Sequence, residues 1–474
     1  MEEADEFDAV LVGTGQAAPA LAVALAKRGE RVALIEGGQL GGSCINAGCT
    51  PTKTLRKSAR LAYLARRAGE FGVHVGKVEV DFAATMERMQ QRVDTARAEL
   101  EQWITHEPNV TLLRDWGSFA GRGAQGFELL AGERRLRAPR VYLNTGTRAV
   151  IPAIPGIADV PHLDNVSLLK LRTLPRHLLI IGGSYIGLEM GQIFRRLGSE
   201  VTVVESGPRI TGREDPEVSA CIASFLQAEG VTVLAGEAVA RVERLDDGVA
   251  LQVGQRRIEG SHLLVATGRL PNTERLKLEA VGVAKDERGF VPTNGELETN
   301  VPGIWALGDI NKRGAFTHTS YQDHEIVLAN HLDAVSAGGP HEGRRRSADG
   351  RTTTYAMFTD PPLGRVGQSE AEARASGKRI LMATFDMKHV SRAKEESETT
   401  GLVKLLVDAD TERFVGATVL GINGDEIIQV ISNFMATGAS WRVMKDALPI
   451  HPTVTEFLPT ILGRLKPLAE VPPR

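Results

Sequence analysis

Two stretches of the chain repeat one pattern of apolar and polar positions. The first, FDAVLVGTGQAAPALAVALAKRGERVALIE, covers residues 7–36, and the second, LLIIGGSYIGLEMGQIFRRLGSEVTVVE, covers residues 178–205. Each predicts an apolar strand, a glycine turn, a helix with small residues on one face, and a second apolar strand that ends in an acid. Two such βαβ units in tandem predict parallel, doubly wound sheets of the α/β class and two nucleotide sites.

The rest of the chain shows weaker periodicities. Helical patterns occur at about 50–70 and 84–106, and residues 118–150 have the pattern of short strands and turns. The glycine-rich, charged stretch 336–352 predicts a surface loop before a last domain. In that domain the pattern alternates between strands (355–359, 402–407, 413–420) and helices (369–376, 424–437).

Composition narrows the class of protein. A chain of 474 residues is too long for one core, and a net charge of −3 argues against a nucleic-acid or membrane-surface protein. No apolar run is long enough to predict a membrane span, and the acidic N-terminus does not resemble a signal peptide. The chain has only three cysteines, which favours a cytoplasmic protein in which a cysteine pair is catalytic rather than structural.

The first glycine turn has the pattern G-x-G-x-x-A, formed by Gly13, Gly15 and Ala18. The first glycine makes the tight turn, and the second lets the backbone approach a pyrophosphate at the helix N-terminus. Glu36, 21 residues after Gly15, ends the next strand and can accept hydrogen bonds from ribose hydroxyls. The alternative is a glycine turn in an α/β domain that binds no nucleotide.

In the second unit the corresponding positions hold Gly182, Ser184 and Gly187. The Cβ of Ser184 is expected to crowd a pyrophosphate. Glu205 ends the following strand, and a carboxylate there favours the free 2′-hydroxyl of NAD over the 2′-phosphate of NADP. Arg209 and Arg213 follow and could bind a phosphate, so NAD(H) is favoured and NADP(H) stays possible.

The most specific signal is GGSCINAGCTPTK at residues 41–53, which places Cys44 and Cys49 five residues apart. This spacing differs from zinc-binding pairs and from the thioredoxin C-x-x-C, and no resident metal is predicted. A disulfide needs Cα atoms within about 7 Å, whereas five residues of helix rise about 7.5 Å. The backbone between the cysteines must therefore be irregular, and Gly48 and Pro51 can supply that irregularity. Two unrelated buried cysteines are the alternative; Cys221, in an apolar helical pattern, is expected to be a core residue.

From about residue 7 to residue 468, the chain resembles the pyridine nucleotide–disulfide oxidoreductases of the glutathione reductase and dihydrolipoamide dehydrogenase type. Besides the cysteine motif, the resemblance rests on VATGRLPN (265–272), IWALGDI (304–310) and HPTVTE (451–456). It implies two Rossmann-like nucleotide-binding domains and a C-terminal α+β dimerisation domain. The implied segments are an FAD-binding domain at 1–150, an NAD(P)-binding domain at 151–272, a second FAD-binding part at 273–350, and an interface domain at 351–474.

The resemblance also implies roles for single residues. Cys49 would be the thiol beside the flavin, and Cys44 the more exposed interchange thiol that attacks substrate. Lys53 would lie near flavin N5, paired with Glu189, although a surface lysine and a helix-face acid are the plain alternatives. The other implied cofactor contacts are Tyr185 as a lid over the flavin, Asp309 on the ribityl chain, Gly42, Ser43, Thr145 and Gly146 on FAD, and Gly268 on NAD(P). Hydride would pass from the nicotinamide through FAD to the cysteine pair, which then reduces an acceptor.

The acceptor is less well specified. Gln16 and the stretches THTSYQDHEIVLANHL and YAMFTDPPLGRVGQSE resemble the mercuric-reductase-like branch. No cysteine follows Cys221, however, so the C-terminal pair of true mercuric reductases is absent. We therefore expect a small-molecule disulfide or a metal ion as acceptor. Dihydrolipoamide dehydrogenase, which shares every motif, is an alternative, and a redox sensor with little turnover is another, supported only by Ser184.

Near the C-terminus, HPTVTE places His451 five residues before Glu456. Histidine changes charge near neutral pH, so it can donate the proton that acceptor reduction needs. Pro452 sets a turn that lets Glu456 fold back and orient the ring. The alternative is a histidine that caps a helix starting at Pro452. The resemblance implies instead a homodimer in which this histidine reaches the cysteines of the partner subunit.

Overall fold

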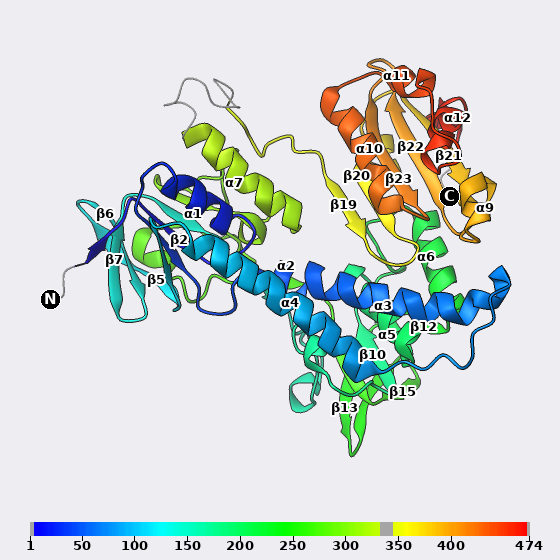
Figure 1. Ribbon diagram of the computed structural model, residues 1–474, viewed down its shortest axis with the longest axis horizontal. Coiled ribbons are helices and arrows are strands. Elements are labelled where there is room, and N and C mark those ends of the chain that lie inside the picture. The colour runs from blue at the N-terminus through cyan, green and yellow to red at the C-terminus, as the bar shows by residue number, and fades with distance from the viewer. Residues whose placement is uncertain (1–3, 332–344, 472–474) are drawn as a thin grey trace. The chain divides into compact units, whose positions relative to one another are not determined.

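The computed structural model describes residues 4–331 and 345–471, which form two compact units (Figure 1). Unit 1 consists of residues 4–55, 83–150, 268–331 and 345–351, and unit 2 of residues 56–82, 151–267 and 352–471. Most of the predicted loop at 336–352 lies outside the described residues; its described part contains no helix or strand. The three boundaries between the four domain segments inferred from the sequence stay predictions. No helix among the described residues is long and apolar enough to cross a membrane.

Unit 1 is built on a five-stranded parallel sheet in the order β18-β8-β2-β3-β4. β2 (Ala9–Val12), α1 (Ala18–Ala26) and β3 (Val32–Ile35) form the first predicted βαβ unit. The other strands of this sheet are β4 (Val110–Leu113), β8 (Val141–Leu143) and β18 (Ile304–Ala306). β9 (Thr147–Ala149) and β17 (Arg269–Pro271) make a separate antiparallel pair.

Both faces of the unit 1 sheet are covered, because successive residues of a strand point to opposite sides. Leu11 belongs to the apolar core that includes residues of α1, of α7 (Thr317–His331) and of α4 (Phe82–Thr105). Val10 and Val12 belong to a second core, on the side of a mixed sheet. That sheet contains β1 (Asp5–Glu6), β5 (Gly117–Gly123), β6 (Gly126–Ala131) and β7 (Arg134–Ala138). The unbroken apolar run of the first strand is thereby explained.

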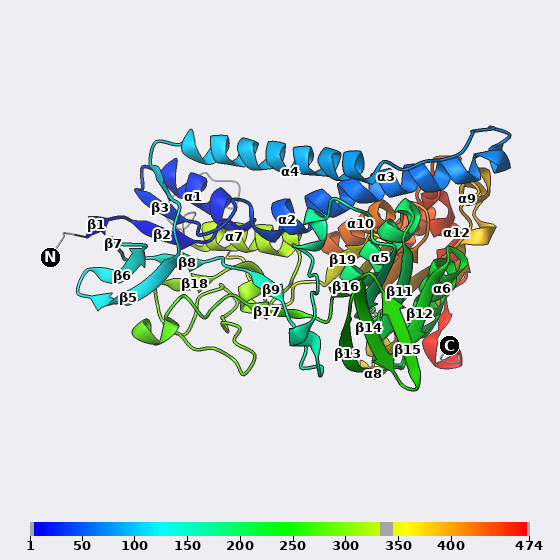
Figure 2. The same ribbon diagram turned by 90° about the horizontal axis from the view of Figure 1, so that it is seen from below.

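Unit 2 contains the second βαβ unit, formed by β10 (His177–Ile181), α5 (Tyr185–Leu197) and β11 (Glu200–Glu205). β12 (Val231–Ala235) and β16 (His262–Val265) complete a four-stranded parallel sheet, and α6 (Pro216–Ala228) precedes β12. Ile181 and Val204 pack with Leu251 of an antiparallel sheet that the sequence analysis did not predict (Figure 2). Its strands are β13 (Val239–Leu245), β14 (Gly248–Val253) and β15 (Arg256–Gly260).

The C-terminal part of unit 2 is a six-stranded antiparallel sheet with α10 (Gly424–Thr437) along one face (Figure 1). Its strands, in order, are β19 (Thr354–Met357), β20 (Leu363–Gly367), β23 (Phe414–Leu420), β22 (Leu402–Asp408), β21 (Ile380–Asp386) and β24 (Lys466–Pro467). The predicted strands correspond to β19, β22 and β23, and the predicted helices to α8 (Glu370–Ala375) and α10, whereas β20 and β21 were missed. The predicted fold class, two nucleotide-type α/β layers plus a C-terminal α+β part, is confirmed.

Candidate functional site

The two cysteines of the GGSCINAGCTPTK motif stand on either side of a helix break in unit 1. Cys44 lies in α2 (Gly42–Ala47), and Cys49 begins α3 (Cys49–Arg67). Gly48 between them has φ −139° and ψ −113°, and a Cβ there would lie 2.8 Å from the carbonyl oxygen of Ser43. The predicted irregularity is confirmed at Gly48, which interrupts the helix so that both thiols can serve one site.

The surroundings of the two thiols make them chemically different. The Sγ of Cys49 lies 3.1 Å from the hydroxyl of Thr317, the first residue of α7. A hydroxyl and the positive end of a helix both favour a thiolate at this sulfur. The hydrogen bond to Cys49, burial and the charge of Cys49 together raise the pKa of the Cys44 thiol well above its usual range. Cys49 is exposed and Cys44 is partly buried, so the expectation that Cys44 is the more exposed of the two thiols is wrong in this structure. Thr317 had not been identified from the sequence.

The cysteine motif is packed directly on the first glycine loop. A Cβ at Gly42 would lie 3.1 Å from the Cα of Gly15. The amide of Gly41 donates to the hydroxyl of Thr14 at 3.0 Å, and the side chain of Gln16 reaches the carbonyl of Gly41 at 3.5 Å. The dithiol and the nucleotide loop of unit 1 thus form one rigid structure.

Each glycine loop is held by the acid that ends the next strand. Glu36 accepts from the amides of Thr14 at 2.9 Å and of Gly38 at 2.8 Å. In unit 2, Glu205 accepts from the corresponding amides of Gly183 and Gly207, both at 2.7 Å. A carboxylate has about four lone-pair sites, so each acid can still accept from a ribose hydroxyl.

The serine in the second glycine loop is explained by the strand that faces it. In unit 1, a Cβ at Gly15 would lie 2.6 Å from the side-chain oxygen of Asn144, which follows β8. The corresponding residue of unit 2 is Ala266, since the amides of both residues donate at 2.8 Å to the last residue of the first strand. Alanine lacks the side chain that excludes a Cβ at Gly15, so Ser184 is accommodated. The facing strand of unit 2 therefore leaves room for the Cβ of Ser184, which the facing strand of unit 1 would not.

Two residues predicted to contact FAD, Asp309 and Ser43, lie in one hydrogen-bonded cluster of polar side chains. Asp309, in the 3₁₀ helix Gly308–Asn311, accepts from the Thr147 hydroxyl at 2.9 Å. Burial raises the pKa of Asp309, and the charge of Arg269 opposes this shift. Arg269 also donates to the Thr147 carbonyl at 2.6 Å and to the Ser43 hydroxyl at 3.3 Å. Arg269 and Thr147 had not been identified from the sequence.

The predicted residues Thr145 and Gly146 lie in the turn after β8. Thr145 donates its hydroxyl to the carbonyl of Asn272 at 2.8 Å, and the Asn272 side chain donates back at 2.9 Å. Gly146 has φ +65°, which favours glycine, and Gly268 has φ +148° in the segment before β17. Asn272, the last residue of the VATGRLPN motif, is thereby bonded to the turn that follows β8.

The remaining predicted residues lie in unit 2 or on α3. Glu189, buried on α5, accepts from the Phe358 amide at 2.8 Å, and Tyr185 at the start of α5 is 38% exposed. Lys53 lies one turn after Cys49 on α3. Since Lys53 belongs to unit 1 and Glu189 to unit 2, their pairing stays a prediction.

The histidine near the C-terminus is exposed and paired with its acid. His451 Nδ1 lies 2.8 Å from Glu456 Oε2, and the His451 side chain is 75% exposed. Leu448 and Ile450 beside it are 97% and 78% exposed, unusually high values for large apolar side chains.

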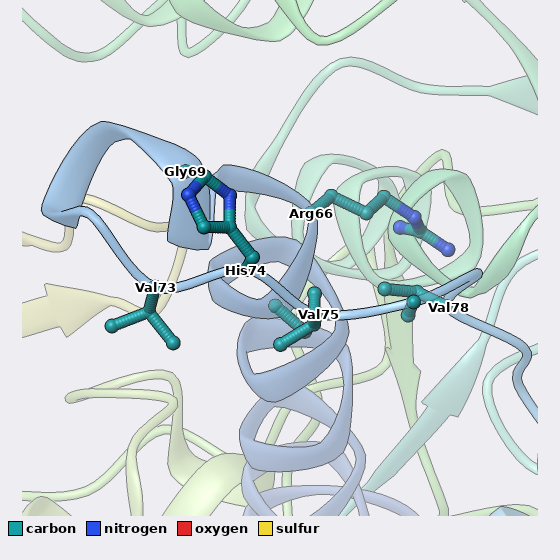
Figure 3. Close-up of a pocket in the computed structure, with 8 residues that line it drawn as sticks. Arg66, Gly69, Val73, His74, Val75 and Val78 are labelled. Carbon is teal, nitrogen blue, oxygen red and sulfur yellow. The ribbon is translucent and has the colours of Figure 1, made fainter.

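Two other features lie away from these residues. A surface hollow of about 400 Å³ lies beside the end of α3 (Figure 3), lined by Ala65, Arg66, Gly69, Val73, His74, Val75, Gly76 and Val78. It contains none of the predicted site residues. Three acids, Asp215, Glu217 and Glu370, bring carboxylate oxygens within 4.8 Å of one another, but the buried ammonium of Lys404 lies among them and pairs with all three. This cluster is an ion network rather than a metal site.

Comparison with known proteins gives concordant matches. The family profile "Pyridine nucleotide-disulphide oxidoreductase" matches residues 7–323, and its "dimerisation domain" profile matches residues 353–461. Probable pyridine nucleotide-disulfide oxidoreductase RclA of Escherichia coli (strain K12) is 33% identical over 465 residues, covering 98% of this chain and 100% of the relative. Mercuric reductase of Streptomyces lividans is 32% identical, covering 95% and 94%. The solved Cu(II) complex of HOCl-induced flavoprotein disulfide reductase RclA from Escherichia coli has a TM-score of 0.86 at 33% identity, covering 96% and 99%.

We expect Thr317→Val to slow alkylation of Cys49 at neutral pH about fivefold, because the thiolate loses a hydrogen bond of about 1 kcal/mol. The measurement is the rate of iodoacetamide labelling in a chain whose Cys44 and Cys221 are serine, so that only Cys49 reacts. Thr317→Ser keeps the hydroxyl and should label at the original rate. Equal rates for the valine and serine variants would show that the hydroxyl does not stabilise the thiolate.

Proposed function

This chain belongs to the pyridine nucleotide-disulphide oxidoreductase family, and we propose that it passes electrons from NADH through FAD to Cys44 and Cys49, and on to a small disulfide or a metal ion. The observation that carries the proposal is the contact of the cysteine motif with the first glycine loop, at Gly42 and Gly15. A dithiol fixed against a nucleotide loop can exchange electrons with the cofactor that the loop holds.

The residues of unit 1 fit FAD. The amides of Gly15 and Gln16, ahead of α1, have no acceptor among the described residues, so both can donate to a pyrophosphate at the helix N-terminus. Glu36 is placed to accept from a ribose, and Asp309 is proposed to hold ribityl hydroxyls. When bound, FAD accepts hydride from the nicotinamide and gives up the electrons as a pair.

The proposed reaction sequence of the two cysteines takes account of the raised pKa of the Cys44 thiol. Two electrons and one proton convert the Cys44–Cys49 disulfide into a Cys44 thiol and a Cys49 thiolate. The Cys44 sulfur, once deprotonated, attacks one sulfur of an acceptor disulfide, and the other half leaves as a thiol after it takes a proton. Cys49 then attacks the mixed disulfide at Cys44, which releases the second thiol and restores the internal disulfide. With Cu(II) as acceptor, the same electron pair would reduce two ions to Cu(I).

Two relatives support a metal ion as acceptor. The name of mercuric reductase states that its substrate is the mercuric ion, and one solved structure of RclA is a complex with Cu(II). The present chain has no cysteine after Cys221, so a metal ion would have to meet Cys44 and Cys49 directly. Dihydrolipoamide dehydrogenase remains the second candidate, because the His451–Glu456 pair suits reduction or oxidation of a dithiol substrate.

A homodimer is proposed to complete the site. His451 and Glu456 form a pair that can donate a proton. The neighbouring apolar side chains of Leu448 and Ile450 are exposed in the single chain, and a partner subunit would bury them. The dimerisation-domain match over residues 353–461 includes all four residues. A two-fold axis would then give two equal sites, each with cysteines from one subunit and His451 from the other.

NADH is proposed as the preferred reductant. In βαβ units of this type, an acid at the end of the second strand accepts from the ribose 2′-hydroxyl of NAD, so Glu205 in that position would repel the 2′-phosphate of NADPH. Arg209 is turned away to the carbonyls of Gly212 and Glu214, both at 3.4 Å. It is therefore engaged within its own loop rather than presented to a phosphate.

A screen of acceptors tests the function. With NADH as reductant, we expect turnover with low-molecular-weight disulfides or with Cu(II) or Hg(II), and little with lipoamide. Cys44→Ser should lower it at least a hundredfold, because no nucleophile remains to attack the acceptor, while NADH still reduces the flavin. Cys221→Ser is the matched control and should keep full activity. Fast turnover with lipoamide would favour dihydrolipoamide dehydrogenase instead.

For the dimer, we expect His451→Ala to slow acceptor reduction about a hundredfold or more and to leave flavin reduction by NADH within about twofold. Stopped-flow absorbance separates these half-reactions. His389→Ala, an exposed histidine in the same sheet region, is the control. A fully active monomer by light scattering, or an equal loss in both half-reactions, would contradict the assigned role.

For the coenzyme, we expect kcat/KM for NADH to exceed that for NADPH at least about tenfold, the effect of about 1.4 kcal/mol of repulsion. Arg209→Ala should leave this ratio nearly unchanged. If the variant selectively lost activity with NADPH, Arg209 would be a phosphate ligand and the preference would rest on another residue.

A further inference from the structure

The residues assigned to FAD line up along one edge of the parallel sheet of unit 1. All five strands of this sheet run in the same direction, so their carboxyl ends meet at one edge, where nucleotides bind in open α/β sheets. The strand order is β18-β8-β2-β3-β4. Asp309 follows β18, Thr145 follows β8, the first glycine loop follows β2, and Glu36 follows β3. Of the five strands, only β4 is followed by no assigned residue.

This order matches the order of the chemical groups in FAD. Asp309 is proposed to bind the ribityl chain, the glycine loop the pyrophosphate, and Glu36 the ribose of the adenosine half. Neighbouring strands lie about 4.8 Å apart, so a base attached to that ribose can reach the end of the next strand, β4. Adenine is the one part of FAD for which the residues discussed so far provide no contact.

Trp116 lies just beyond the end of β4. It is the third residue after Leu113, and its indole packs on the backbone of Gly37, the residue that follows Glu36. A Cβ at Gly37 would lie 2.3 Å from Cδ2 of Trp116, so the contact requires glycine there. Trp116 is nevertheless 55% exposed, although tryptophan is usually well buried. An aromatic ring is thus held open beside the acid that is placed to bind the ribose.

Arg275 covers part of the same ring. Its guanidinium carbon lies 4.2 Å from the ring centroid of Trp116. The segment that carries Arg275 is fixed to β5, because the amide of Phe119 donates to the carbonyl of Leu276 at 2.9 Å and Leu276 is buried. Among the described residues, neither the Arg275 guanidinium nor the Trp116 indole N–H has a hydrogen-bond partner. Both groups therefore keep their donors for a ligand.

We propose that Trp116 and Arg275 bind the adenine ring of FAD. A purine offers a flat π face, on which a guanidinium can stack, and ring nitrogens that accept hydrogen bonds. The indole and guanidinium N–H groups are donors only, so they complement these nitrogens. The inference rests on the proposed function, since it concerns the FAD that unit 1 is proposed to hold.

An exposed arginine on an aromatic ring is not by itself a binding site, and unit 1 contains another example. The guanidinium carbon of Arg122, on β5, lies 5.3 Å from the centroid of the Phe127 ring. Arg122 is exposed and lies six residues after Trp116, about 20 Å away along an extended strand. Arg122→Ala therefore removes the same kind of side chain from an aromatic ring of unit 1 far from the end of β4, and is the matched control.

The experiment measures the Kd of FAD and of ADP for the FAD-depleted full chain, by the change in flavin fluorescence and by competition with FAD. ADP carries the adenosine and a diphosphate but no flavin. We expect Arg275→Ala to raise both Kd values about tenfold, because a stacking partner of the base is lost. Arg275→Lys, which keeps the charge without a planar group, should raise them nearly as much. Arg122→Ala should leave both within about twofold.

Tryptophan emission gives a second readout that does not depend on catalysis. We expect ADP to change the tryptophan fluorescence of the original chain, since the base lies against Trp116. In Trp116→Phe, this change should be absent at saturating ADP, although the other tryptophans remain.

Three results would overturn the assignment. The first is an unchanged Kd of FAD and ADP in Arg275→Ala, and the second is weaker binding of FAD with unchanged binding of ADP, which would place Arg275 at another part of the cofactor. The third is an equal loss in Arg122→Ala. Failure of the proposed function is recognised separately: a chain that binds FAD but reduces no acceptor loses that function and keeps the adenine site, whereas a chain that binds no FAD loses both.

Discussion

The close contact between Gly42 and Gly15 is the constraint on which the rest of the site depends. A Cβ at Gly42 would lie 3.1 Å from the Cα of Gly15, and Gly42 has φ +60°, so both the close approach and the backbone conformation favour glycine here. Gly48 then interrupts the helix so that Cys44 and Cys49 face one site, and Thr317 supports the second sulfur. The position of the dithiol is thus set by the loop that is proposed to bind FAD.

The two nucleotide units show how one scheme is adapted twice. In both, the acid at the end of the second strand accepts from one backbone amide of the glycine turn and from the amide two residues beyond the acid itself. Unit 1 places Asn144 opposite the turn and therefore needs Gly15 there, whereas unit 2 places Ala266 opposite and accepts Ser184. The loss of the middle glycine in the second turn is thus accompanied by a smaller residue on the facing strand.

Local pattern predicted the features that depend on residues close in sequence. These include both βαβ units, the helix break at Gly48 and the contact of His451 with Glu456. It did not predict Thr317 beside Cys49, 268 residues away, or the backbone bond from Phe358 to Glu189, 169 residues away. Such contacts are set by tertiary packing, and a threonine hydroxyl or a backbone amide has no sequence signature. The sheet β13–β15 was missed because its strands contain no catalytic or cofactor-binding motif that would single them out.

The most direct measurement is an anaerobic titration with NADH, followed by flavin absorbance and by thiol counting after denaturation. We expect the first equivalent to generate two new thiols per chain and a long-wavelength absorption band while the flavin stays largely oxidised, since the electron pair rests on the cysteines. A second equivalent should then bleach the flavin. Full bleaching by the first equivalent, with no gain of thiols, would contradict a relay through Cys44 and Cys49.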